Sequence, residues 1–104
     1  MSILTEGKKE ELNFTLIGAG KVGSAISLEL FKREIRPVQI INRSLLKAES
    51  LAKKTSCPLF STKVEIKSSP YFILIAVNDD SIPGVLEELG QINIPVFHCS
   101  GSTT

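Results

Sequence analysis

Residues 13–26 read NFTLIGAGKVGSAI, and this stretch decides how the rest of the chain is interpreted. An apolar, strand-like segment at 14–17 runs into a turn that contains Gly18, Gly20 and Gly23, and a helical pattern follows. In a GxGxxG turn the first glycine permits a tight bend and the second lets a diphosphate approach the backbone, while the third lets the helix lie close to the strand. The same spacing can also serve close packing with no ligand. The remainder of the chain has to separate these two interpretations.

The composition excludes several classes of function. The chain has 104 residues, enough for one domain with a core but small for a complete enzyme with two substrates. The formal net charge is +1, without the basic surface expected of a nucleic-acid-binding protein. The longest apolar run, residues 72–77, is far shorter than the ~20 residues of a membrane span. Residues 1–12 form a polar tail that lacks the apolar core of a secretion signal. Cys57 and Cys99 have no metal-ligand spacing, so we expect free thiols in a cytoplasmic protein and no metal site.

Strand-like and helical segments alternate along residues 13–104, which we interpret as one domain. Strands are expected at 14–17, 38–41, 58–60, 71–77 and 95–99, and helices at 22–35, 45–54 and 81–89. The segment 64–67 fits either a strand or one helical turn. Such alternation predicts an α/β fold, a doubly wound parallel sheet of about five strands with helices on both faces. Its ligand should lie at the carboxyl ends of the strands, where the strand order reverses.

The turn after the first strand is expected to hold the diphosphate of a dinucleotide. The helix that begins near Lys21 directs unpaired N–H groups and the positive end of its dipole towards that position. A Walker A loop is excluded, because the turn is not followed by Lys-Ser or Lys-Thr. The residues predicted to bind the cofactor here are Gly18, Ala19, Gly20, Lys21, Val22 and Gly23.

The end of the second strand distinguishes NADP from NAD. NAD-binding proteins usually carry Asp or Glu there, about 20 residues beyond the turn, to bind the ribose hydroxyls. Here Asn42 stands in that position, and Arg43 and Ser44 follow, a pair that would bind the 2′-phosphate that a carboxylate would repel. Lys47, one helical turn further on, could add positive charge. We therefore expect NADP, with NAD less favoured. The alternative is a solvated Arg43 and a Ser44 that only caps the second helix.

Four motifs, LIGAGKVG, NRS, ILIAVNDDSI and VFHCSGS, together resemble a group of Rossmann-like NADP-dependent oxidoreductases that includes pyrroline-5-carboxylate reductase and the deazaflavin-dependent NADP reductases. The motifs extend over nearly all of residues 13–102. The resemblance implies that Ala76, Val77 and Asn78, after the fourth strand, pass beside the ribose and nicotinamide, and that Ser100 contacts cofactor or substrate. Within this group the motifs most resemble a less characterised Rossmann-like oxidoreductase family. Asn78 departs from the pattern, since that family usually has proline there and the reductases often have lysine.

The resemblance also implies a second, largely helical domain that supplies substrate contacts, and residues 13–104 do not contain it. No residue is assigned a catalytic role: Asp79 and Asp80 are expected to begin a helix, and Asp80 or Ser81 to cap it. On the helix at 22–35, one apolar face expected to pack on the sheet contains Val22, Ala25, Ile26 and Leu30. A second stripe, expected on nearly the opposite side, consists of Leu28, Phe31 and Ile35. That stripe would meet the second domain or another copy of the chain, unless the tail or a loop covers it.

The sequence thus predicts the NADP(H)-binding domain of an oxidoreductase that transfers hydride to or from a small substrate. The alternative is a non-catalytic module that senses NAD(P) through a conformational change, because a fold does not settle a function. A methyltransferase would need an acid for its ribose at the end of the second strand, and Asn42 and Arg43 argue against it.

Overall fold

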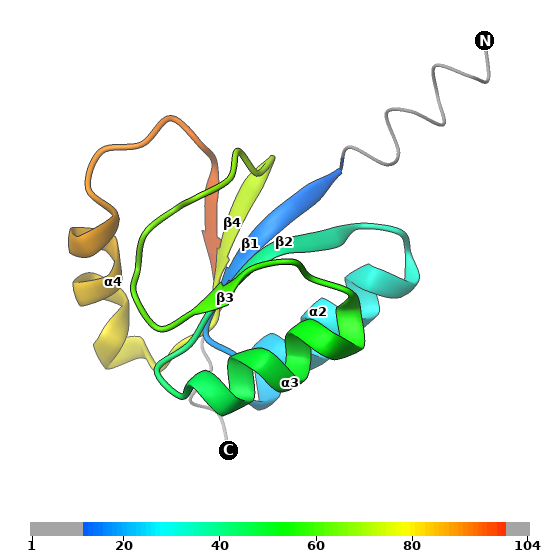
Figure 1. The fold of residues 1–104 in the computed structure, drawn as a ribbon. Coiled ribbons are helices and arrows are strands. Elements are labelled where there is room, and N and C mark those ends of the chain that lie inside the picture. The colour runs from blue at the N-terminus through cyan, green and yellow to red at the C-terminus, as the bar shows by residue number, and fades with distance from the viewer. Residues whose placement is uncertain (1–11, 100–104) are drawn as a thin grey trace, which may run out of the picture.

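A computed structural model describes residues 12–99, in which a five-stranded sheet carries helices on both faces (Figure 1). The strands are β1 (Asn13–Ile17), β2 (Arg36–Ile41), β3 (Phe60–Ser61), β4 (Phe72–Ile75) and β5 (Val96–His98). The helices are α2 (Lys21–Lys32), α3 (Leu45–Thr55) and α4 (Ile82–Leu89), the last preceded by a 3-10 turn at Asp79–Ser81. The strands and helices expected elsewhere are present, with ends shifted by a few residues, but the segment 64–67, expected to be a strand or one helical turn, is neither. Ser100 and all but the last residue of the predicted tail lie outside the described residues.

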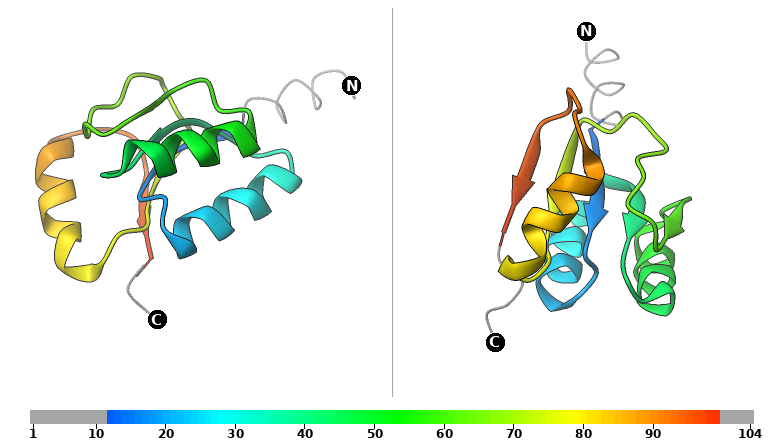
Figure 2. Two further views of the ribbon diagram at one scale, coloured as in Figure 1. Left: turned by 60° about the horizontal axis from the view of Figure 1, so that its bottom comes forward. Right: turned by 90° about the vertical axis from the view of Figure 1, so that its left-hand side faces the viewer.

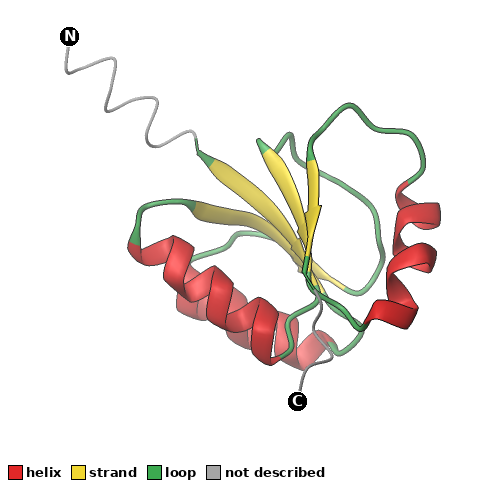
Figure 3. Cartoon of the chain, turned by 180° about the vertical axis from the view of Figure 1, so that it is seen from behind, coloured by secondary structure: helices red, strands yellow, loops and turns green. Residues whose placement is uncertain are grey.

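All five strands are parallel, and their spatial order is β3-β2-β1-β4-β5. The order reverses between β1 and β4, which creates the switch point where a doubly wound sheet binds its ligand. The sheet lies between α2 and α3 on one side and α4 on the other (Figures 2 and 3). The prediction of a doubly wound α/β fold is confirmed.

Two apolar clusters, one on each face of the sheet, form the core. Successive strand residues point to opposite faces. From β4, Leu74 enters the cluster with α2 and α3, whereas Ile73 and Ile75 enter the cluster with α4. Burial on both faces explains why this strand reads as an unbroken apolar run.

The segment between β3 and β4, residues 62–71, contains neither helix nor strand. Val64 and Ile66 nevertheless pack into the cluster with α4, so this segment covers part of that face. The buried side chain of Gln39 on β2 anchors it. Its Nε2 donates to the carbonyl of Glu65 at 2.7 Å, and its Oε1 accepts from the N–H of Lys67 at 2.9 Å. Because both ends of the amide are paired, Gln39 is buried without an unsatisfied polar group.

The apolar residues of α2 form one broad face rather than two opposite stripes. Gly23 and Ser27 are the buried residues of the helix, and Ala25, expected to face the sheet, is exposed. Partly buried residues that pack on the cluster with α2 and α3 include Ile26, Leu28, Leu30 and Ile35. The prediction of two stripes was wrong, because Leu28 and Ile35 pack on the same cluster as Ile26 and Leu30. In addition, α2 ends at Lys32, so Ile35 lies beyond the helix. Phe31 is half-buried.

Neither cysteine is in a disulfide: Cys57 is buried and Cys99 is half-buried. Burial raises the pKa of the Cys57 thiol, and a hydrogen bond with the backbone of Leu59 partly offsets this rise. Since the thiolate is the reactive form, the raised pKa lowers the reactivity of Cys57. No helix between residues 12 and 99 is both long and apolar enough to span a membrane.

Candidate functional site

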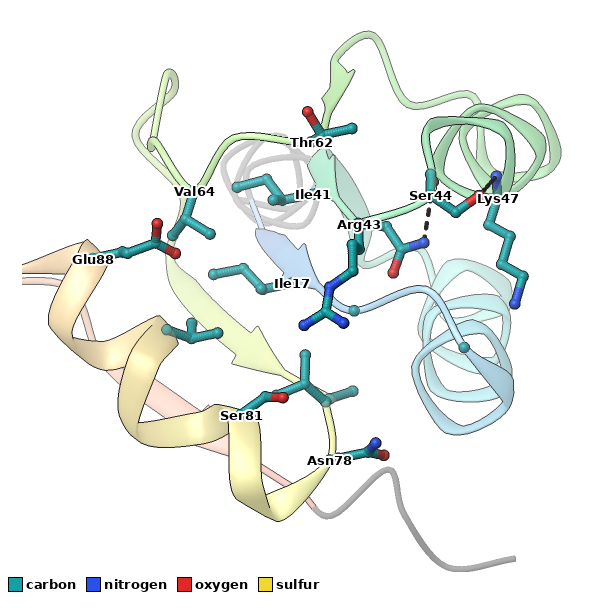
Figure 4. A pocket seen from close by; sticks show the side chains of 16 residues that line it. Ile17, Ile41, Arg43, Ser44, Lys47, Thr62, Val64, Asn78, Ser81 and Glu88 are labelled. Carbon is teal, nitrogen blue, oxygen red and sulfur yellow. Dashed lines mark hydrogen bonds between the residues drawn. The ribbon is translucent and has the colours of Figure 1, made fainter.

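A cleft of about 590 Å³ opens at the carboxyl ends of β1, β2 and β4, at the switch point of the sheet (Figure 4). Its size falls within the range of small-molecule binding sites. The turns after β1, β2, β3 and β4 line it together with α4. The predicted cofactor-binding residues that line the cleft are Gly18, Gly20, Asn42, Arg43, Ser44, Lys47, Ala76, Val77 and Asn78.

Packing within the protein explains two of the three glycines. Gly18 has φ +107°, and a Cβ at this position would collide with the carbonyl of Ala76. A Cβ at Gly23 would collide with the carbonyl oxygen of Gly18 and lie 3.2 Å from the Cβ of Ala76. These two glycines therefore let the turn and the start of α2 approach the end of β4.

Gly20 has no such explanation. Its φ of −80° is accessible to any residue, and a Cβ built there would have no heavy atom within 4 Å beyond its chain neighbours. Gly20 lines the cleft and directly precedes α2. The interpretation of the turn as packing alone therefore leaves this glycine unexplained, whereas a ligand that approaches the backbone accounts for it.

The beginning of α2 offers donors for such a ligand. The first intrahelical bond runs from the N–H of Ser24 to the carbonyl of Gly20 at 2.9 Å. The N–H groups of Lys21, Val22 and Gly23 precede that bond, and no side chain caps the helix among the described residues. Unpaired N–H groups and the helix dipole together favour an anion at this end of α2. Lys21, Val22 and Gly23 do not themselves line the cleft and would contribute through these backbone groups.

Asn42 joins the turn after β1 to the turn after β2. Its Oδ1 accepts from the N–H of Ala19 at 2.8 Å, and its Nδ2 donates to the carbonyl of Ser44 at 3.1 Å. A carboxylate could make the first of these bonds but not the second, because it has no hydrogen to donate. Asn42 therefore braces the two turns against each other, and the N–H of Ala19 is already engaged within the protein.

Arg43 extends into the cleft, and Figure 4 shows its guanidinium between Ile17 and Ser81. The side chain of Lys47 points in a different direction in the same view. Neither Arg43 nor Lys47 forms an ion pair with another residue in the 12–99 region. Both cations are exposed and can pair with an incoming anion.

Ser44 is the N-cap of α3, and its Oγ accepts from the N–H of Lys47 at 3.4 Å. The capping role expected for Ser44 is thus present. A hydroxyl that accepts one hydrogen bond still has its own hydrogen to donate. The cap is therefore compatible with a bond from Ser44 to a phosphate oxygen.

The turn after β4 closes the other side of the cleft. Val77, Asn78 and Ser81 line it, and the N–H of Ser81 donates to the carbonyl of Asn78 at 2.8 Å within the 3-10 turn. No side chain caps either this turn or α4, so the expectation that Asp80 or Ser81 caps the helix was wrong. The backbone bond of the 3-10 turn leads the chain into α4 instead.

Sequence reasoning missed the remaining lining residues, which are Ile17, Ile41, Thr62, Val64, Ser81, Val85 and Glu88. Ile17 and Ile41 end β1 and β2, so their place beside the ligand could have been inferred from the strand ends. Thr62 and Val64 belong to an irregular segment that no sequence period identifies. Glu88 lies in the last turn of α4, where it reads as a solvated charge.

Two kinds of known protein are similar to this chain, one through a family model and one through a solved structure. A family model described as shikimate / quinate 5-dehydrogenase matches residues 3–69, which include β1 to β3 and both turns braced by Asn42. No curated protein sequence gives a significant match. Among solved structures, the chain is similar to a Bacteroides fragilis protein described as a candidate NADP oxidoreductase. The identity is 23%, the TM-score is 0.78, and the match covers 91% of this chain and 38% of that one. The chain thus spans well under half the length of that protein, and the likeness shows a shared fold.

Proposed function

Since the chain belongs to the shikimate / quinate 5-dehydrogenase family, we propose that it is the NADP(H)-binding unit of an oxidoreductase that transfers hydride to or from a small substrate. One observation supports the proposal: two groups that favour an anion border the same cleft. The first is the uncapped start of α2 beside Gly20, and the second is the guanidinium of Arg43. A dinucleotide with a diphosphate and a separate 2′-phosphate presents two anions to match them.

In this proposal the diphosphate binds the N–H groups of Lys21, Val22 and Gly23, and the open position of Gly20 allows it to approach. The 2′-phosphate binds Arg43, with Ser44 and Lys47 as further donors. The turn after β4, from Ala76 to Asn78, faces the cofactor across the cleft. The nicotinamide supplies the hydride chemistry, and this unit holds and orients it.

The relation to pyrroline-5-carboxylate reductase and the deazaflavin-dependent NADP reductases is part of the proposal, as is a cytoplasmic location. We also propose that substrate contacts and catalytic groups come from a second domain. The Bacteroides fragilis protein supports this, because most of its chain lies outside the matched region. A sensor of NADP(H) would bind the same cofactor. Hydride transfer by a protein that contains both this unit and the proposed second domain would distinguish the enzyme from the sensor.

The test is a titration of NADPH and NADH against the wild-type chain and Arg43→Ala. One charge-assisted hydrogen bond contributes about 1.5–3 kcal/mol, which corresponds to a roughly ten- to hundredfold weaker affinity for NADPH in the variant. The affinity for NADH should not change, because NADH has no 2′-phosphate.

Arg36→Ala is the matched control. Arg36 is an exposed arginine at the start of β2, whereas Arg43 follows the end of that strand, and Arg36 does not line the cleft. It should leave both affinities unchanged. Equal affinity of the wild-type chain for NADPH and NADH would defeat the NADP assignment.

A further inference from the structure

The two ends of the domain carry opposite charge. Residues 43–67, which include α3 and β3, contain six Lys or Arg and two Glu. Residues 68–99, which include α4 and β5, contain four Asp or Glu and no Lys or Arg. The strand order β3-β2-β1-β4-β5 separates these segments, and Figure 1 shows α3 and α4 on opposite sides of the molecule. The domain therefore has a positive end and a negative end.

The exposed side of α4 contains a glycine that packing within the chain does not require. Gly84 lies inside this helix, and its φ is not in the left-handed region. A Cβ built there would have no heavy atom within 4 Å beyond its chain neighbours. Glycine is less favourable than alanine inside a helix, but it lets another segment approach the backbone closely. Gly84 thus marks a position at which a partner can approach α4.

Apolar and acidic side chains surround Gly84. Pro83 and Leu86 are exposed, the latter to 42%. Asp80 and Glu87 are also exposed, and neither forms an ion pair with another residue between 12 and 99. None of these five residues lines the cofactor cleft. We call Asp80, Pro83, Gly84, Leu86 and Glu87 the acidic face.

The outer side of α3 has matching properties with the opposite charge. A shallow groove there is lined by Leu46, Glu49, Ser50, Lys53 and Lys54. Leu46 is 77% exposed, and its spacing from Ser50 and Lys53 places all three on one side of the helix. Lys53 lies 3.7 Å from Glu49, whereas Lys54 forms no ion pair within the described chain. We call Leu46, Ser50, Lys53 and Lys54 the basic face; it too lies outside the cofactor cleft.

We propose that the acidic face of one copy of the chain binds the basic face of a second copy. Leu46 would pack against Leu86, and the open backbone at Gly84 would let the two helices approach each other. Charge selects this arrangement, because two acidic faces or two basic faces would repel each other. Since the two faces differ and lie at opposite ends of the domain, each copy can bind two others, which gives chains or closed rings. The cleft stays open in such an assembly, so the inference does not depend on the proposed function.

The test measures association by sedimentation at several protein concentrations and at low and high salt. The wild-type chain should associate, and salt should weaken the association by screening the charges. Asp80→Lys/Glu87→Lys and Lys53→Glu/Lys54→Glu should each weaken it at least about tenfold. An equimolar mixture of the two double variants should associate like the wild type, because each reversed face then meets its complement.

Gly84→Ala separates a role in association from a role in stability. Alanine should raise the midpoint of thermal unfolding, because it favours the helix, and yet weaken association, because its methyl group holds the helices apart. Lys32→Glu/Arg36→Glu is the control for charge. Both residues are exposed and lie on neither face, so this variant should associate like the wild type.

Three results would overturn the proposal, with thermal unfolding used to confirm that each variant is folded. The first is a wild-type chain that stays monomeric at every concentration in low salt. The second is a mixture of the two reversed variants that does not recover association. The third is association that Phe31→Ser abolishes while both reversed variants retain it, since that result would assign the contact to α2.

Discussion

Replacing Asn42 by alanine should weaken the binding of NADPH and of NADH by the same factor. Asn42 makes two hydrogen bonds, to the N–H of Ala19 and to the carbonyl of Ser44. At about 0.5–1.5 kcal/mol each, their loss should lower the free energy of unfolding by roughly 1–3 kcal/mol. If about 1 kcal/mol of this stabilisation serves to order the turn before a dinucleotide binds, its loss lowers the affinity for either dinucleotide about fivefold. Both use the turn, so both should be affected.

Asn42→Asp separates the brace from the charge. The carboxylate can still accept from Ala19, but it cannot donate to Ser44, and it places a negative charge beside the proposed 2′-phosphate site. NADPH should therefore lose more affinity than NADH, and the preference should move towards NADH. Urea unfolding measures the stability, and calorimetric titration with both dinucleotides measures the affinities.

Arg43→Ala is the comparison for both Asn42 variants, because it should weaken NADPH alone. If Asn42→Ala also weakened NADPH alone, Asn42 would be a direct phosphate contact and the reasoning about a brace would be refuted. Full retention of stability in Asn42→Ala would contradict the stabilising role assigned to the two hydrogen bonds.

The glycine turn, the 62–71 segment and α2 give three further predictions. Gly20→Val should fold like the wild type yet bind NADPH at least about tenfold more weakly, whereas Gly18→Val should destabilise the fold, because Gly18 has a positive φ and a side chain there would collide with the carbonyl of Ala76. Thermal unfolding and titration separate the two effects, and unimpaired NADPH binding by Gly20→Val would indicate that the turn serves packing alone. Gln39→Leu should lower the free energy of unfolding by about 2 kcal/mol or more, because it leaves the carbonyl of Glu65 and the N–H of Lys67 unpaired. Hydrogen exchange at the Lys67 amide should become faster, and unchanged exchange would contradict the proposal that Gln39 anchors the 62–71 segment. Phe31→Ser tests the proposal that copies of the chain associate through Leu28, Phe31 and Ile35. A monomer of lower stability in thermal unfolding would favour a role of Phe31 in the core, whereas a chain of unchanged stability whose oligomeric state changes in sedimentation would favour an interface.

The fold was open to prediction from sequence because its signals are local. Strand runs and helical periods alternate along the chain, and strands joined through a crossover helix lie parallel in one sheet. The turn at 18–23 can be recognised in the sequence by its glycines and by the strand-like and helical patterns that flank it. Where prediction erred, as on α2, the error concerned the direction in which a helix faces. That direction is set by what packs against the helix, and here Leu28 packs on the same cluster as Ile26 and Leu30.

The sequence by itself determined the order of elements, the glycine turn and the cationic turn after β2, because each is written in adjacent residues. Only the tertiary structure showed that packing does not explain Gly20, that Asn42 links two turns 23 residues apart, and that Glu88 shares a cleft with Arg43. These relations depend on distances between segments far apart in the chain. The order of strands in the sheet sets those distances, and no local pattern of residue types carries them.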